Sequence, residues 1–155
     1  MRALCFLFLL GSIFTGMAQT QNDKTPSPPD VYQQFLIAMV SSDSNTVERL
    51  ALTNQDLPML TSRHLSWVPR KLAISHIKAH PYHVLKIGEV FHLPHGRVIG
   101  PTEQFEKNGW VLIANDDDPI CHMLQKVGNE WKVDAGDLIA ARKAVERKMK
   151  EKDGK

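Results

Sequence analysis

The sharpest pattern of apolar and polar positions lies in residues 116–144 (DDDPICHMLQKVGNEWKVDAGDLIAARKA). Residues 120–127 and 130–133 are patterned as a pair of β-strands. Between them, Gly128 and Asn129 supply the positive φ values that a two-residue hairpin requires. Because the first strand carries apolar side chains on both faces, we expect a sheet that is covered on both sides over part of its length.

The same stretch ends in a predicted helix whose apolar positions recur at helical spacing. This stripe consists of Leu138, Ala141, Val145 and Met149. Asp134 or Asp137 can cap the first turn. Basic side chains gather in the last turns, at the end where a helix dipole favours cations.

Helical spacing also dominates the first half of the chain. The stripe of Val31, Phe35 and Met39 predicts a first helix that starts near Asp30, which can cap it. Residues 41–44 are polar and predict the end of this helix and the cap of a second one. The apolar face of the second helix consists of Val47, Leu50 and Ala51.

Two further helical segments precede the strands. Residues 53–56 (TNQD) resemble a capping box and predict a helical turn that carries Leu57 and Leu60. Residues 69–80 have helical spacing, and Pro81 ends this helix because the residue before a proline is pushed out of the helical region. Its apolar positions are Leu72, Ala73, Ile74 and Ile77.

After Pro81 the pattern changes to that of strands. Residues 82–93 are rich in β-branched and aromatic side chains, and residues 94–96 (PHG) predict a turn into a return strand at 97–99. Another strand is expected at 110–114, behind an Asn-Gly pair. The order of elements predicts an α+β fold, with N-terminal helices packed on a curved antiparallel sheet and a C-terminal helix.

The N-terminus has the three-part pattern of a secretory signal. Arg2 precedes an apolar run, and small residues follow up to Ala18. The apolar run is shorter than the ~20 residues that cross a bilayer as a helix. We therefore expect a signal peptide at 1–18, cleaved after Ala18, and a secreted or periplasmic protein with no stable membrane insertion after cleavage. The alternative is an uncleaved membrane anchor.

The rest of the chain predicts one domain. Residues 19–30 are polar and contain prolines, so we expect a disordered linker there. A single α+β domain is expected at 31–150 and a disordered tail at 151–155. Cys121 is the only thiol left after cleavage, which excludes an intrachain disulfide, and its apolar strand predicts burial.

Helices at the front followed by a curved antiparallel sheet resemble the nuclear-transport-factor-2-like superfamily, a cone-shaped α+β fold. The segments that carry this resemblance are VYQQFLIAMVSSDSNTVERL and CHMLQKVGNEWKVDA. The end of the chain, NEWKVDAGDLIAARKA, is also similar to a group of uncharacterised small secreted bacterial proteins. The superfamily includes isomerases, dehydratases, cyclase-like enzymes and non-catalytic binding or dimerisation modules, so the resemblance does not select a function. The long helix after the last strand departs from the usual cone, and no catalytic residue of the superfamily matches this chain.

The histidines are the first candidate for chemistry. His76 and His80 are four residues apart on a predicted helix, so they share a face, and His83 follows just beyond Pro81. Imidazoles on one face are typical ligands of zinc, copper or nickel, and His92 is an alternative third ligand. Without a cysteine pair or a nearby carboxylate to complete the set, we expect no metal and no cofactor, and histidines that are solvent-exposed or at the core edge.

Three further candidates favour structural roles. Asp116, Asp117 and Asp118 lack the alternation of a calcium loop and predict a solvated turn. Cys121 and His122 are neighbours on a strand and point to opposite faces, so they form no catalytic dyad. In the conical pocket that the resemblance implies, Asp134 or a histidine can serve as a general base, but the place of Asp134 before a helix favours a cap.

The net charge of +2 indicates little about the kind of partner, and the distribution of charged residues along the chain indicates more. A basic tract runs from Arg63 to Lys86. Because no stacking motif accompanies this basic tract, we expect no nucleic-acid partner. The tract is expected to be a solvated face, and the alternatives are that it binds acidic glycans, phospholipid headgroups or an acidic protein.

Together these patterns predict a small exported α+β protein that serves as a non-enzymatic binding or interaction module, with a possible homodimer. A pocket enzyme of the isomerase, dehydratase or cyclase type is the first alternative. Its mark would be an inward-facing acid and a histidine within hydrogen-bond reach in a cavity. A histidine-based metal-binding protein is the second alternative.

Overall fold

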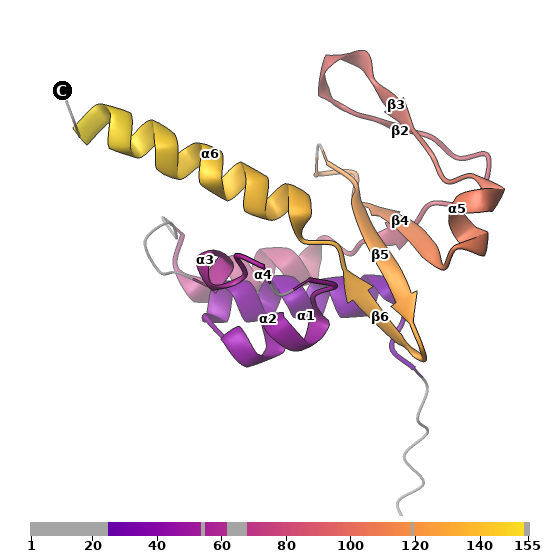
Figure 1. Cartoon of the computed structure of the whole chain (residues 1–155), viewed down its shortest axis with the longest axis horizontal. Coiled ribbons are helices and arrows are strands. Elements are labelled where there is room, and N and C mark those ends of the chain that lie inside the picture. Colours follow the sequence, from indigo (N-terminus) through magenta and orange to yellow (C-terminus); the bar gives the residue numbers. More distant parts are fainter. Residues whose placement is uncertain (1–24, 54, 62–67, 119, 154–155) are drawn as a thin grey trace, which may run out of the picture.

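A computed structural model describes residues 25–53, 55–61, 68–118 and 120–153 (Figure 1). The signal peptide predicted at 1–18 lies outside these residues, as does most of the linker. The helices are α1 (Pro28–Ser41), α2 (Ser44–Leu50), α3 (Pro58–Thr61), α4 (Arg70–Ala79), α5 (Glu103–Lys107) and α6 (Gly136–Asp153), with a 3-10 turn at Pro94–Gly96. The strands are β1 (His83–Val84), β2 (Phe91–His92), β3 (Val98–Ile99), β4 (Trp110–Ala114), β5 (His122–Val127) and β6 (Glu130–Val133).

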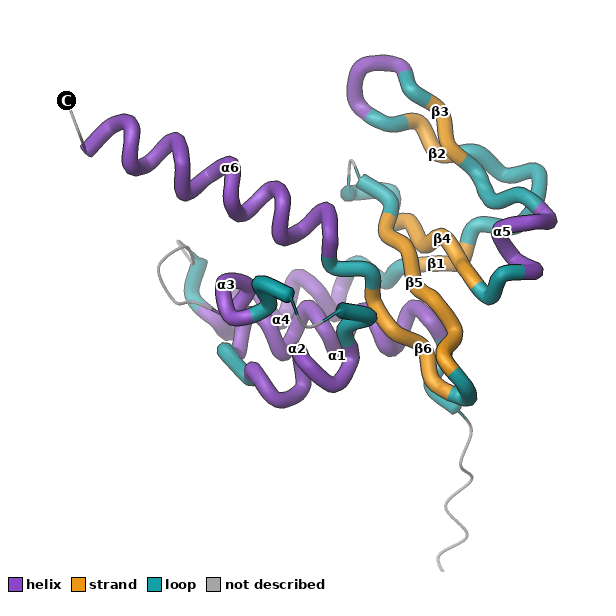
Figure 2. Tube along the Cα trace, viewed as in Figure 1, coloured by secondary structure: helices purple, strands orange, loops and turns teal. Residues whose placement is uncertain are grey.

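The predicted α+β class is confirmed. A four-stranded antiparallel sheet has the order β1-β4-β5-β6, and β2 and β3 pair separately (Figure 2). In the β5–β6 hairpin Val127 pairs with Glu130, as the predicted turn requires. Of the two turn residues, Gly128 has a positive φ of 62° and Asn129 does not.

The sheet is covered on both faces, as the strand pattern predicted. On one face Ile113, Leu124 and Val133 are fully buried with side chains of α1, α2 and α3. On the other face Leu112 and Cys121 form a smaller core that is packed against residues of β2, β3 and α5. These two layers hold the sheet between the helical half of the molecule and the β2–β3 hairpin.

The first helix begins earlier than the sequence predicted. Ser27, not Asp30, is the N-cap: its hydroxyl accepts from the Asp30 backbone N–H, and the Asp30 carboxylate accepts from the Ser27 N–H, which completes a capping box. Proline is tolerated in a first turn, where its missing N–H costs no hydrogen bond. Residues 28–30, assigned to the linker, are therefore helical. At the other end α6 continues to Asp153, into the predicted tail.

The capping box expected at 53–56 does not start the third helix. Asp56 instead has a φ of 59°, and its carboxylate accepts from the Lys143 ammonium of α6 at 2.6 Å. The helix α3 begins two residues later, at Pro58. Leu57 and Leu60 are nevertheless both buried.

Two predicted apolar stripes are only partly covered. Leu72 in α4 is 62% exposed, and in α6 Val145 is 44% and Met149 38% exposed. Ile139 near the start of α6 is buried, whereas the later turns run away from the sheet (Figure 1). Helical spacing shows which side chains share a face, but whether another element lies against that face is decided by the tertiary structure. Among the described helices, none combines the length and apolar character needed to cross a membrane.

Candidate functional site

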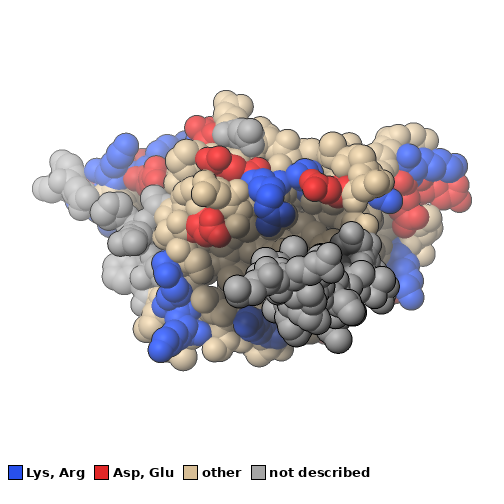
Figure 3. All heavy atoms as spheres, turned by 90° about the horizontal axis from the view of Figure 1, so that it is seen from below, with Lys and Arg blue, Asp and Glu red and all other residues tan. Residues whose placement is uncertain are grey.

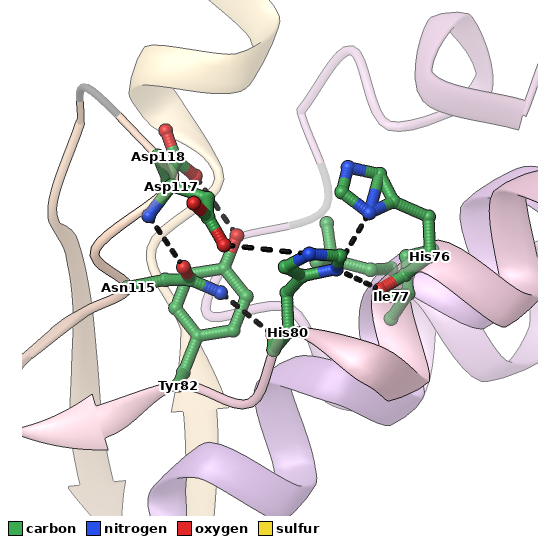
Figure 4. A pocket seen from close by; sticks show the side chains of 8 residues that line it. His76, Ile77, His80, Tyr82, Asn115, Asp117 and Asp118 are labelled. Carbon is green, nitrogen blue, oxygen red and sulfur yellow. Dashed lines mark hydrogen bonds and ion pairs between the residues drawn. The ribbon is translucent and has the colours of Figure 1, made fainter.

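A pocket of about 180 Å³ lies where α1, α4 and the loop 115–118 meet (Figure 4). Leu36 of α1 and Ile77 of α4 form its apolar wall, together with the Tyr82 side chain just before β1. This volume is below the ~300–1,000 Å³ of pockets that hold drug-sized ligands. The pocket therefore has room for a small molecule or for a single side chain of a partner.

His76 and His80 form the α4 side of the pocket. Their four-residue spacing brings the two Nδ1 atoms to 2.6 Å, and His80 Nδ1 lies 2.8 Å from the backbone oxygen of His76. Because a carbonyl oxygen only accepts, His80 Nδ1 carries the proton and His76 Nδ1 accepts. The Nε2 atom of His80 faces a carboxylate oxygen of Asp117 at 3.4 Å.

Asn115 ties the opposite side of the pocket to α4. Its side chain is buried, and its Nδ2 donates to the backbone oxygen of His80 at 2.6 Å. Its Oδ1 accepts from the Asp117 backbone N–H at 2.8 Å. One buried amide thus fixes both the end of α4 and the loop that carries the aspartates.

Asp118 is the most heavily hydrogen-bonded group of the site. Its Oδ2 accepts from the Tyr82 hydroxyl at 2.8 Å and from His122 Nε2 at 3.0 Å. Its Oδ1 accepts from the Ile120 backbone N–H at 3.0 Å. The carboxylate therefore joins the segment after α4, the loop and β5.

The surroundings of Asp118 act on its pKa in opposite directions. Burial raises the pKa, but the hydrogen bonds from His122 and Tyr82 and the charge of His122 outweigh burial, and the net pKa is lowered. Burial, followed by the hydrogen bond to Asp118 and its charge, raises the pKa of Tyr82. At neutral pH, Asp118 is thus an anion that accepts from a neutral phenol.

Behind Asp118 lies a buried aromatic stack. The Tyr32 ring stacks on His122 with centroids 4.5 Å apart, and it meets Tyr82 edge to face at 4.8 Å. Tyr32 and His122 are both buried. Burial, and then the nearby Tyr82 and Asp118, raise the pKa of Tyr32. This stack connects the polar site to the main core through α1.

The structure corrects the prediction of a solvated turn at 116–118 for one residue. Asp116 and Asp117 are exposed, but Asp118 is half-buried and holds Tyr82 and His122. A run of acidic residues is usually solvated, and only tertiary folding brings two donors to one of them.

The predicted histidine cluster is assembled only in part. His76 and His80 come together, whereas His83 and His92 are exposed on β1 and β2 and do not line the pocket. In the described part of the chain, no group of three or more His, Cys, Asp or Glu side chains is arranged to hold a metal ion. The side chain of His95 lies outside the described residues.

Cys121 and His122 lie on opposite faces of the sheet, as predicted. His122 stacks on Tyr32 on the helical side, and Cys121 is buried in the smaller core, where burial raises the pKa of its thiol. A thiol of this kind is a poor nucleophile. Asp134 accepts from the Gly136 backbone N–H at 3.0 Å, an Asx-turn contact just before α6, and Ala135 holds the N-cap position that the sequence predicts for Asp134 or Asp137.

Sequence patterns gave no signal for several members of the site. Tyr32 occupies a core position of α1, Tyr82 begins a predicted strand, and Asn115 lies in a polar loop. Their common role depends on the fold, because they are far apart in the chain. The spacing of His76 and His80 was the one local signal.

Of the basic tract predicted from Arg63 to Lys86, the described residues Arg70, Lys71, Lys78 and Lys86 are all exposed. Arg63 lies outside the described residues. On the face shown in Figure 3, basic and acidic side chains are interspersed rather than gathered in one patch.

No family model matches the chain, and neither curated proteins nor solved structures give a match.

Proposed function

We propose that this chain is an exported, non-enzymatic binding module and that the pocket between α4 and the loop 115–118 is its ligand site. The observation that carries this proposal is the saturation of Asp118. Both oxygens of its carboxylate accept hydrogen bonds from the protein, so the group anchors the pocket rather than reacting in it. A pocket with a fixed polar wall and an apolar wall is typical of a binding site.

A pocket enzyme is the second candidate, and one contact favours it. Asp118 and His122 are an acid and a histidine within hydrogen-bond reach, and Asp118 lines a cavity. Against it, the lowered pKa of Asp118 makes this carboxylate a weak base, whereas general bases work best with a pKa near the operating pH. His122 is buried behind Asp118, with its Nε2 already engaged.

The binding site is tested by blocking the pocket. Purified protein is titrated with a set of small anionic, neutral and cationic compounds, while backbone amide shifts are followed by NMR. We expect at least one compound to shift the amides of lining residues such as Ile77 and Asn115. His76→Trp places a large ring at the pocket wall and should weaken this binding about tenfold or more.

Ser75→Trp is the matched control, because Ser75 is exposed on the same helix and does not line the pocket. It should leave the affinity unchanged. If no compound shifts the lining residues, or if His76→Trp binds as tightly as Ser75→Trp, the pocket is not the ligand site.

Export is the second part of the proposal and rests on the pattern of residues 1–18. We expect N-terminal sequencing of the mature protein to begin at Gln19. A start at Met1 in envelope fractions would contradict cleavage and favour the uncleaved anchor.

The relation to the nuclear-transport-factor-2-like superfamily stays a proposal. It is supported by the α+β class and by helices that precede an antiparallel sheet. The homodimer also stays a prediction. The exposed apolar side chains of Val145 and Met149 are compatible with it.

A further inference from the structure

Three hydrogen-bond donors that line the pocket already donate to the protein itself. The Tyr82 hydroxyl donates to Asp118, the Asn115 amide donates to the His80 carbonyl, and His80 Nδ1 faces the His76 carbonyl. Such donors are not free for a ligand unless an internal hydrogen bond is broken, which is costly for buried groups.

One acceptor that lines the pocket, the carboxylate of Asp117, is exposed. Asp117 has a side chain that is 64% exposed, and its Oδ2 lies 3.4 Å from His80 Nε2. This separation is longer than the ~2.7–2.9 Å of a strong charge-assisted hydrogen bond. Next to it, Asp118 is held as an anion by its lowered pKa. A ligand in the pocket therefore meets negative charge, and the exposed carboxylate of Asp117 is the acceptor that it can reach.

The remaining wall of the pocket is apolar. Leu36 and Ile77 approach from two helices, and Tyr82 contributes a ring whose hydroxyl points to Asp118 (Figure 4). A ligand that packs against the apolar wall and pairs with the acidic side has a short apolar stem and a cationic end with several hydrogen-bond donors.

We infer that the pocket takes a primary ammonium or guanidinium group on a short apolar stem, with Asp117 as the main partner of the cation. This chemistry occurs in small alkylamines and in the lysine and arginine side chains of proteins. The inference rests on the proposed binding function and specifies the ligand class of the same pocket.

Matched probes test the ligand class. Acetyl-lysine methylamide and acetyl-norleucine methylamide differ in the terminal ammonium group, and n-butylammonium represents a free amine. Titrations followed by NMR should show that the lysine probe shifts the amides of Ile77, Asn115 and Asp117, with an affinity about tenfold higher than that of the norleucine probe. Tighter binding of the lysine probe than of n-butylammonium indicates a partner's side chain, and equal binding indicates a small free amine.

Asp117→Asn removes the charge at an exposed position and should weaken binding of the lysine probe about tenfold. Asp116→Asn is the control, since Asp116 is an exposed neighbour outside the pocket lining. It should bind like the unchanged protein. Equal binding of the lysine and norleucine probes, or equal affinities of the two variants, would overturn the inference.

The two proposals fail in different ways. If anionic or neutral compounds shift the lining residues while the cationic probes do not, the pocket is a binding site and only the ligand class is wrong. If no compound of any charge shifts them, the binding function fails as well.

Discussion

Replacing Asp118 with Ala is expected to lower the free energy of unfolding by about 2–4 kcal/mol, because three donors, two of them partly or fully buried, lose their acceptor at once. The Tyr82 hydroxyl, His122 Nε2 and the Ile120 backbone N–H all donate to this carboxylate. His122 is 6% exposed, so water cannot readily replace the lost partner. Urea denaturation followed by circular dichroism measures the change.

The loss of stability that we expect for Asp118→Ala depends on pH. The pKa of Asp118 is lower in the folded protein than the value of about 3.9 usual for an unfolded chain. The stability that the Asp118 carboxylate gives to the folded protein is therefore complete at a pH above its unfolded pKa. This stability is lost as the pH falls through its folded pKa. The difference in stability between the unchanged protein and Asp118→Ala should be full at neutral pH and should shrink below about pH 4.

Asp116→Ala is the control for both measurements. Asp116 lies two residues away in the same acidic run and is exposed, so its replacement should change stability by less than about 0.5 kcal/mol. If Asp118→Ala behaves like Asp116→Ala, Asp118 does not anchor the site.

Replacing Phe35 with Ala is expected to destabilise the protein by about 3–5 kcal/mol, the range found for large aromatic side chains removed from cores. Phe35 is fully buried in the core that joins α1 to the sheet. Its ring lies 6.4 Å from that of Tyr32, centroid to centroid, so the cavity would open next to the stack behind the pocket. Thermal and urea unfolding measure the loss.

Leu72→Ala provides the comparison within the helices. Leu72 belongs to an apolar stripe in the sequence, but it is 62% exposed in α4. Its replacement should therefore change stability by less than about 0.5 kcal/mol. A loss similar to that of Phe35→Ala would mean that the outer face of α4 is covered.

The hairpin is the part of the fold that could be predicted most fully. Its strand alternation and its Gly-Asn turn are local signals, since each depends on residues next to one another in the chain. The strands β5 and β6 pair with the predicted turn, and Leu124 and Val133 are fully buried. The start of α1 is also a local signal, but it consists of the reciprocal pairing of Ser27 with Asp30 and not of Asp30 alone.

The sequence predicts only some of the contacts in the candidate site. The helical spacing of His76 and His80 brought these two residues together as expected. The sequence predicts a solvated turn at Asp118, because nothing in its neighbourhood along the chain reveals that Tyr82 donates to it. The strand pattern excludes His122 as a partner of Cys121, but it does not predict the stacking of His122 on Tyr32.

The sequence by itself determined the α+β order of elements, the hairpin turn and the two-sided burial of β5. These features follow from spacing along the backbone, whose periods of 3.6 and 2 residues assign side chains to faces. The tertiary structure alone decided which faces are covered and which polar groups meet. It left Leu72 exposed and placed Asp118 between Tyr82 and His122, because contacts between distant segments depend on how the helices pack against the sheet.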